Sequence, residues 1–82
     1  MNITIYATTT CPFCEMLKEF LEERKFSYTV KLVDQDPSAK EEMVTRSEGY
    51  LGVPFTVVAK DDGSQVKIVG FDKSLFSQAL GV

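Results

Sequence analysis

The sequence contains no histidine, only two cysteines and no long run of apolar residues. A closed zinc site needs four ligands, drawn mainly from cysteine and histidine, so these shortages argue against a structural zinc site within one chain. A metal ion shared between two chains stays open. A secreted mini-protein that depended on disulfides would be expected to carry more than one possible bridge. The cysteine pair is therefore better interpreted as redox chemistry than as a scaffold.

Other absences narrow the class of protein. The longest apolar stretches are too short for a membrane span, and Met1 leads directly into a predicted strand without a signal peptide, so we expect a cytoplasmic protein. The 9 basic and 12 acidic residues are mixed along the chain, which argues against a nucleic-acid surface. Residues 1–82 are enough for one domain, and no repeat or linker divides them. No stretch is apolar enough to argue for an obligate dimer, so we expect a monomer.

The two cysteines occupy one motif, Cys11-Pro12-Phe13-Cys14, between an alternating apolar run and a helical one. Pro12 suits the first position of a helix, which places Cys11 at the N-cap and Cys14 one turn later. Free backbone N–H groups and the helix dipole favour a thiolate at an N-cap. We therefore predict that Cys11 is the nucleophile and that Cys14 is the resolving thiol.

Apolar residues at helical spacing predict three helices. The first runs from Pro12 to Lys25 and the second from Pro37 or Ser38 to about Ser47, with Asp36 as its N-cap. The third follows Asp72, which we expect to be its N-cap. Its predicted apolar face consists of Leu75, Phe76, Ala79 and Leu80.

Alternating or β-rich segments predict four strands. They are residues 2–7, 28–34, 53–59 and 65–69. The first two strands flank the first helix as a βαβ unit and should be parallel, whereas the last two form an antiparallel hairpin. The predicted order is β-α-β-α-β-β-α, an α/β domain with a four-stranded mixed sheet flanked by three helices.

Three motifs in this order carry a family resemblance. They are Cys11-Pro12-Phe13-Cys14, Gly52-Val53-Pro54 before the third strand, and Val69-Gly70-Phe71-Asp72 before the last helix. From about Ile3 to Leu80 the chain resembles a glutaredoxin-like member of the thioredoxin superfamily, which implies a thioredoxin-like fold.

The resemblance also implies a substrate-binding surface around the cysteines. In that family the proline matching Pro54 is cis, and the backbone of the residue matching Val53 pairs with an extended substrate. From the residues alone, a trans proline opening a strand stays open. Tyr6 either borders the groove in which the substrate would bind or packs in the core. The implied substrate-binding residues are Pro12, Phe13, Val53, Pro54, Gly70, Phe71 and Asp72.

The chain departs from glutathione-using glutaredoxins at the positions that hold the tripeptide. Thr8 stands at a basic position, Gly52 replaces a threonine, Val69 replaces a glycine and Lys73 replaces an acidic residue, whereas Asp72 is retained. Fewer charged anchors should weaken glutathione recognition. The pattern is similar to short glutaredoxin-like proteins and to the redoxins that serve ribonucleotide reductase, although Pro12-Phe13 favours a true glutaredoxin.

We therefore expect a thiol-disulfide oxidoreductase without a metal or other tightly bound cofactor. The resemblance implies disulfide-containing protein substrates, ribonucleotide reductase among the candidates. Electrons would come from glutathione, acting as a co-substrate, or from thioredoxin reductase. Two alternatives remain. One is a dimeric module whose iron–sulfur cluster is bound by Cys11 of each chain and by glutathione thiols. The other is a thiol pair with a structural role only.

Overall fold

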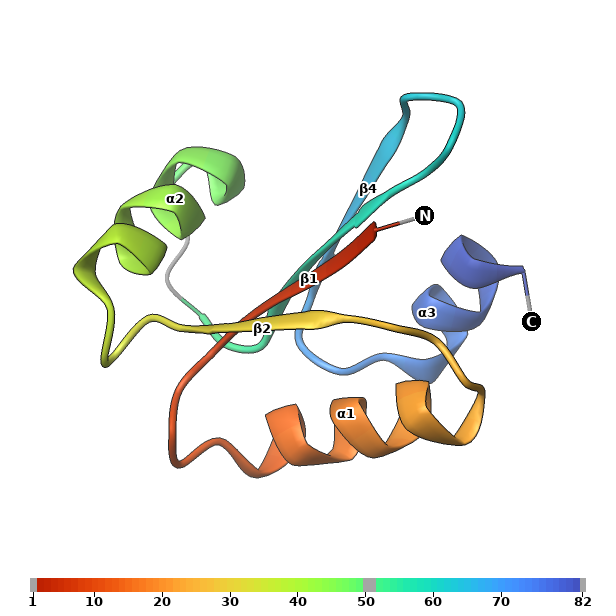
Figure 1. The fold of residues 1–82 in the computed structure, drawn as a ribbon, viewed down its shortest axis with the longest axis horizontal. Helices are drawn as coiled ribbons and strands as arrows, with labels where there is room; N and C mark the ends of the chain where they lie inside the picture. Colours follow the sequence, from red (N-terminus) through yellow and green to blue (C-terminus); the bar gives the residue numbers. More distant parts are fainter. Residues whose placement is uncertain (1, 50–51, 82) are drawn as a thin grey trace.

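The computed structural model describes residues 2–49 and 52–81, and these form four strands and three helices in the predicted order (Figure 1). The elements are β1 (Asn2–Ala7), α1 (Pro12–Glu23), β2 (Thr29–Leu32), α2 (Pro37–Ser47), β3 (Phe55–Ala59), β4 (Gln65–Val69) and α3 (Lys73–Leu80). The predicted N-caps Cys11, Asp36 and Asp72 are confirmed. No helix in this described part of the chain is long and apolar enough to cross a membrane.

The strands form one mixed sheet in the order β2-β1-β3-β4. β1 lies parallel to β2, with Ile5 opposite Val30, and antiparallel to β3, with Ile5 opposite Thr56. β3 and β4 form the predicted antiparallel hairpin. Since β1 is central and leads directly into the cysteine motif, the reactive segment begins at the carboxyl end of a strand that is supported on both sides.

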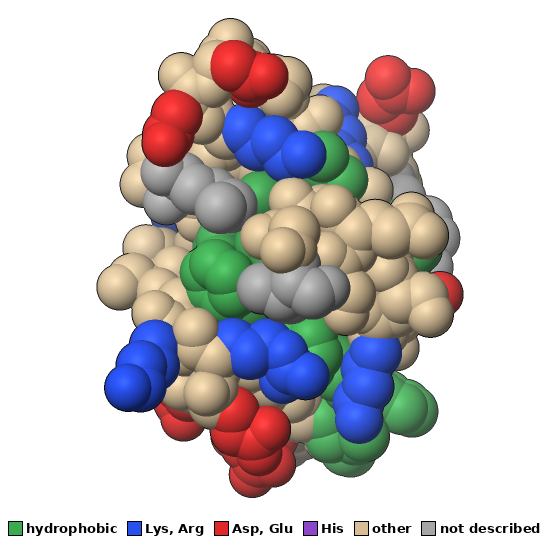
Figure 2. Space-filling view, turned by 90° about the vertical axis from the view of Figure 1, so that its right-hand side faces the viewer, with side chains coloured by type: hydrophobic (Ala, Val, Ile, Leu, Met, Phe, Trp, Pro, Cys, Tyr) green, Lys and Arg blue, Asp and Glu red, His purple; other side chains and the backbone are tan. Residues whose placement is uncertain are grey.

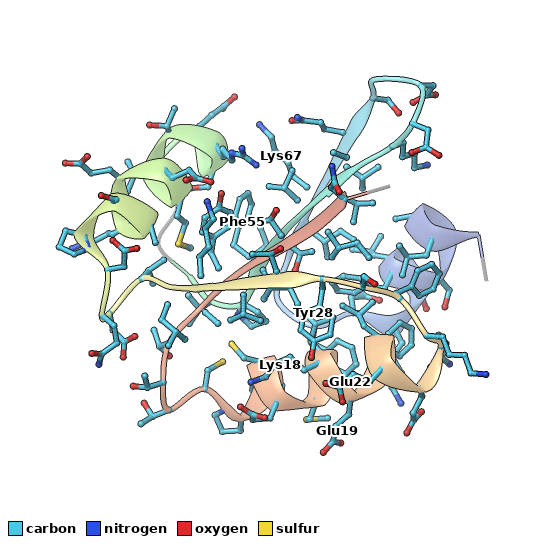
Figure 3. All side chains as sticks on the ribbon, in the orientation of Figure 1. Lys18, Glu19, Glu22, Tyr28, Phe55 and Lys67 are labelled. Carbon is cyan, nitrogen blue, oxygen red and sulfur yellow. The ribbon has the colours of Figure 1, made fainter. Side chains whose placement is uncertain are left out.

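The two faces of the sheet are covered by different helices (Figure 1). α1 and α3 pack on one face, where Leu17, Leu21 and Phe76 join Ile5 and Val58 in the larger core cluster. On the opposite face α2 packs Met43 against a smaller cluster formed by Tyr6, Phe55 and Val57. Tyr6 is thus a core residue, and Phe55 lies between α2 and the sheet (Figure 3).

Several element boundaries differ from the predicted ones. α1 ends at Glu23 rather than Lys25, because Lys25 has a left-handed backbone (φ 61°) and Phe26 turns back to donate a hydrogen bond to the Leu21 carbonyl. β2 and β3 are shorter than predicted. α2 ends at Ser47, as predicted, and its C-cap Glu48 has a left-handed backbone (φ 58°). Tyr50 and Leu51, in the turn that we expect after this helix, lie outside the described residues.

The predicted apolar face of α3 is wrong at one position. Leu75 is 46% exposed, whereas Phe76, Ala79 and Leu80 are buried. α3 is only eight residues long and contacts the sheet along one narrow stripe, which Leu75 falls outside. Val44 of α2 is likewise exposed, so that helix buries only Ala39 and Met43.

Charged side chains of both signs share the end of the molecule that carries the chain termini. Figure 2 shows lysine or arginine and acidic side chains around a partly exposed hydrophobic area on that face. This arrangement agrees with the mixed charge pattern of the sequence.

Candidate active site

Cys11 sits at the N-cap of α1 with an extended backbone (φ −99°, ψ 108°). Its Sγ accepts a hydrogen bond from the backbone N–H of Cys14 at 3.2 Å. Pro12 occupies the first turn, where its missing N–H leaves no helical bond unmade. This geometry supplies a hydrogen bond and the positive end of a helix dipole to a negative charge on the Cys11 sulfur.

The two thiols are free and differ in their environment. Cys11 is partly exposed, whereas Cys14 is only 1% exposed and belongs to the main core cluster. Burial, followed by a hydrogen bond to Cys11, raises the pKa of the Cys14 thiol to about 12, against the opposing effects of the Thr8 amide and the Lys18 charge. Cys14 therefore stays protonated at neutral pH, and its thiol can donate a hydrogen bond to the Cys11 sulfur.

The Val53–Pro54 peptide bond is cis, as the family resemblance implied. Pro54 is buried, and its carbonyl accepts a hydrogen bond from the Gly70 amide at 2.8 Å. Cys11, Val53 and Phe71 all pack against the core cluster that contains Cys14. The Gly70–Pro54 hydrogen bond thus joins the second and third motifs, and all three motifs pack against the same core cluster. The role of each residue in substrate binding stays a prediction.

The remaining predicted site residues have different surroundings. Phe13 is 58% exposed beside the cysteines, as expected for a ring able to meet a substrate. Phe71 packs edge-on against Phe20 at 5.7 Å between ring centroids. The Asp72 carboxylate caps α3 by accepting hydrogen bonds from the Ser74 and Leu75 amides. These two bonds already use part of the capacity of Asp72 to bind a ligand.

One contact near the cysteines was not predicted from the sequence. Asp34 accepts hydrogen bonds from the backbone N–H and the hydroxyl of Thr9, at 3.1 and 2.7 Å, and these bonds lower the pKa of the Asp34 carboxyl. The bond from the Val33 amide to the Ala7 carbonyl continues the β1–β2 pairing toward the same loop. The predicted parallel pairing was a signal for this contact, since it brings the ends of β1 and β2 to one edge.

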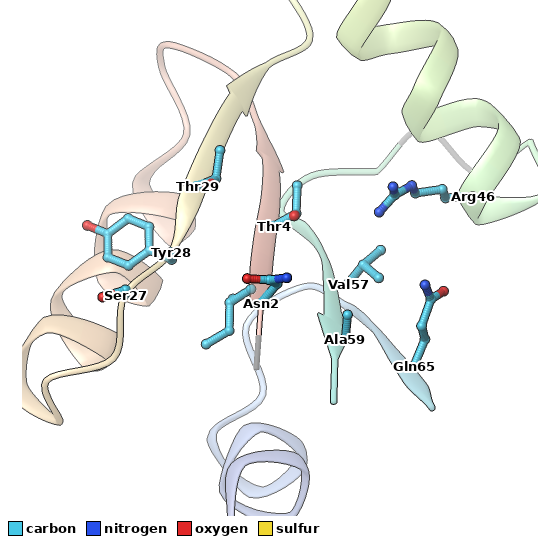
Figure 4. A pocket seen from close by; sticks show the side chains of 10 residues that line it. Asn2, Thr4, Ser27, Tyr28, Thr29, Arg46, Val57, Ala59 and Gln65 are labelled. Carbon is cyan, nitrogen blue, oxygen red and sulfur yellow. The ribbon is translucent and has the colours of Figure 1, made fainter. Parts of the chain in front are cut away.

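A separate hollow of about 340 Å³ lies at the other end of β1, away from the cysteine motif (Figure 4). Its walls include Asn2 and Thr4 of β1, Thr29 of β2 and Arg46 of α2. None of the residues that line it is a cysteine. The thiol chemistry and this hollow therefore belong to opposite ends of the sheet.

Comparisons with known proteins agree with this geometry. The glutaredoxin family model matches residues 3–62. An uncharacterized glutaredoxin-like 8.6 kDa protein from the rubredoxin operon of Clostridium pasteurianum is 39% identical over 72 residues, or 88% of each chain.

Two solved structures share the fold over almost the whole chain. The mutant T8A of the thioredoxin-like protein BC3987 has a TM-score of 0.77 at 31% identity, over 95% of this chain and 97% of that one. The glutaredoxin-like protein NrdH-redoxin from Escherichia coli has a TM-score of 0.75 at 29% identity, over 95% and 93%. The predicted thioredoxin-like fold is confirmed, and the chain belongs to the glutaredoxin family.

Proposed function

We propose that this protein is a dithiol reductant of protein disulfides, with Cys11 as the nucleophile and Cys14 as the resolving thiol. The asymmetry of the two sulfurs supports this assignment. Cys11 is partly exposed and accepts a hydrogen bond from the Cys14 amide, while the Cys14 thiol is buried and keeps its proton. A substrate disulfide therefore meets Cys11 first.

The reaction comprises two thiol–disulfide exchanges. The Cys11 thiolate attacks one sulfur of the substrate, so a Cys11–substrate bond forms, the substrate S–S bond breaks and the departing sulfur takes up a proton. Cys14 then loses its proton and attacks the Cys11 sulfur. The Cys11–Cys14 disulfide forms and the second substrate thiol leaves, which transfers two electrons to the substrate.

The buried position of Cys14 suits the second exchange. Cys14 lies one helical turn from Cys11, and the Thr8 amide and the Lys18 charge favour its thiolate once the proton has left. Because burial raises the pKa of Cys14, attack by this sulfur is expected to be slower at low pH than attack by Cys11.

We further propose that a reductase of the thioredoxin reductase type, rather than glutathione, returns the electrons. Two charged anchors for glutathione are replaced by Thr8 and Lys73, Val69 stands in place of a glycine, and the retained Asp72 caps α3. NrdH-redoxin, which the chain resembles in structure, is described as having a thioredoxin-like activity profile. Ribonucleotide reductase is a candidate among the disulfide-bearing substrates.

The test is NADPH-coupled reduction of insulin, with thioredoxin reductase in one arm and glutathione plus glutathione reductase in the other. We expect turnover with thioredoxin reductase, no turnover by Cys11→Ser, and a stalled mixed disulfide with Cys14→Ser that mass spectrometry can identify. Turnover by the Cys11→Ser variant would contradict the nucleophile assignment. Turnover with glutathione alone would overturn the proposed electron donor.

The same preparation tests the iron–sulfur alternative. A dithiol protein purified without oxygen is colourless, so visible absorbance that disappears in Cys11→Ser would support a cluster-binding module instead. Thr9→Ser is the matched control for Cys11→Ser, because it is a conservative change in the same loop and keeps the hydroxyl that donates a hydrogen bond to Asp34. Visible absorbance should be the same in this variant as in the wild type.

A further inference from the structure

An apolar strip leads away from the reactive thiol along the outer side of α1. Phe13 is 58% exposed and Met16, one turn further along, is 47% exposed. Residues three apart on a helix are neighbours on its surface, so the two side chains lie next to each other. Contiguous exposed apolar surface on a small protein commonly marks a place of contact.

The strip ends in a groove between α1 and the segment that joins β4 to α3. The groove has a volume of about 170 Å³ and is lined by Met16, Glu19, Phe20, Glu23, Arg24, Phe71 and Lys73. Phe20 is nearly buried; the edge-on ring of Phe71 and the Arg24 guanidinium, 3.8 Å from the centroid of Phe20, pack against it. Pockets for small-molecule ligands usually have about 300–1,000 Å³, so this groove is of a size for a single side chain.

The charges around the groove do not favour one sign of ligand. Glu19 and Glu23 belong to α1, and Glu19 points away from the sheet (Figure 3). Arg24 lies 3.8 Å from the Glu23 carboxylate, and Lys73 lines the groove from the start of α3. Two acidic and two basic residues largely offset each other, so the apolar surface is left as the selective feature.

We propose that the groove formed by Met16, Phe20 and Phe71 seats a large apolar side chain of a protein substrate, next to the cysteine that Cys11 attacks. This inference rests on the proposed function and names the class of substrate that the site prefers. The exposed side chains of Phe13 and Met16 lie on α1 between the cysteine motif and the groove. Glutathione has no apolar side chain to fill the groove, so only peptide and protein disulfides gain from it.

The experiment compares two families of peptide disulfides that differ in one residue. One family carries a single leucine and the other a single serine, placed in turn at each position on either side of the cysteine. Cystine is the reference substrate, because it contains neither residue. Burial of one large apolar side chain in a half-open groove predicts that wild-type kcat/KM is about tenfold higher for the best leucine peptide than for its serine counterpart.

Met16→Ser should reduce this preference by about threefold or more and leave the rate with cystine unchanged, because only the wall of the groove is lost. Met16→Leu should restore the preference. Leu75→Ser is the matched control, since Leu75 is as exposed on α3 as Met16 is on α1 but does not line this groove. We expect that variant to behave like the wild type.

The other outcomes are distinguishable. Equal kcat/KM for leucine and serine peptides at every position, or an unchanged preference in Met16→Ser, overturns the groove while the proposed function stands. A Met16→Ser variant that also loses activity toward cystine shows that Met16 supports the thiols, which overturns the groove as well. A wild-type protein that reduces none of the disulfides contradicts the proposed function itself.

Discussion

At the scale of single residues, the two cysteines acquire different chemistry from a separation of only three positions. Cys11 lies before the helix, where its sulfur accepts a hydrogen bond from the Cys14 N–H, whereas the Cys14 side chain lies within the first turn and is buried in the core. Local helix geometry is enough to produce this difference, because the N-cap residue flanks the helix whereas a residue of the first turn can face the core. The order in which the thiols react follows from it.

Alkylation should reveal this order directly. With iodoacetamide at neutral pH, we expect the Cys11→Ser variant to be labelled at Cys14 at least about tenfold more slowly than Cys14→Ser is labelled at Cys11. Burial raises the pKa of Cys14 from 9.0 to about 12, so its thiolate fraction, and with it the labelling rate, should keep rising with pH beyond 9. The rates are measured by mass spectrometry of quenched samples. Equal labelling rates in the two variants would contradict the assignment of roles.

The sequence carried enough information for the N-cap and for the roles proposed for the thiols, because both depend on residues close together in the chain. It did not predict that Thr9 is tied to Asp34, or that Met16 and Phe71 line one groove. Those contacts join elements that are far apart in the sequence. Met16 lies outside the buried stripe of α1, and only the fold brings Phe71 across the groove from it.

At the scale of elements, α2 is the helix with the least apolar support. It buries only Ala39 and Met43, and its attachment relies on Glu42. The Glu42 carboxylate accepts a hydrogen bond from the hydroxyl of the buried Tyr6 and pairs with Lys31 at 2.8 Å. One side chain thereby ties α2 to both β1 and β2. Tyr6 in turn packs against Phe55, the residue after the cis proline.

Removing this tether should destabilise the fold. Glu42→Ala leaves the Tyr6 hydroxyl buried without an acceptor and is expected to lower the free energy of unfolding by about 1–3 kcal/mol. Glu42→Gln retains an acceptor and loses only the partly exposed ion pairs with Lys31 and Arg46, at a cost of about 1 kcal/mol. Urea denaturation gives both values. The neighbouring Glu41→Ala is the control, and a Glu42→Ala protein as stable as that control would disprove the tether.

Element types and order were predicted correctly from periodicity and from caps, but the way in which helices meet the sheet was not. Leu75 fits the helical spacing of α3 as well as Phe76 does, yet it is exposed because the short helix touches the sheet along one line. Similarly, the first helix was predicted to continue to Lys25, but it ends at Glu23 because Lys25 is left-handed, and Phe26 then packs against the core. Burial depends on neighbours that a linear pattern does not contain.

At the scale of the whole molecule, the same core that holds the fold together also holds two titratable groups without charge. Cys14 is in the cluster between the sheet and α1, and Tyr6 is in the cluster under α2. Burial raises the pKa of both groups, and hydrogen bonds to Cys11 and Glu42 add to the effect. Each face of the sheet therefore contains a group that resists losing its proton as long as the protein is folded.

This arrangement predicts that the reduced protein loses stability in alkaline solution. Above the pKa of an unfolded cysteine, the unfolded chain binds fewer protons than the native one, so the free energy of unfolding falls as pH rises, with a limit of about 1.4 kcal/mol per pH unit for one proton. For Cys14 this decline extends from about pH 9 to about pH 12. Urea denaturation of reduced wild type and reduced Cys14→Ala at several pH values in this range isolates its contribution. The variant should show the shallower decline, since it lacks the Cys14 thiol while Tyr6 and Tyr28 are common to both proteins. Parallel declines for the two proteins would mean that Cys14 is not held as a thiol by the fold.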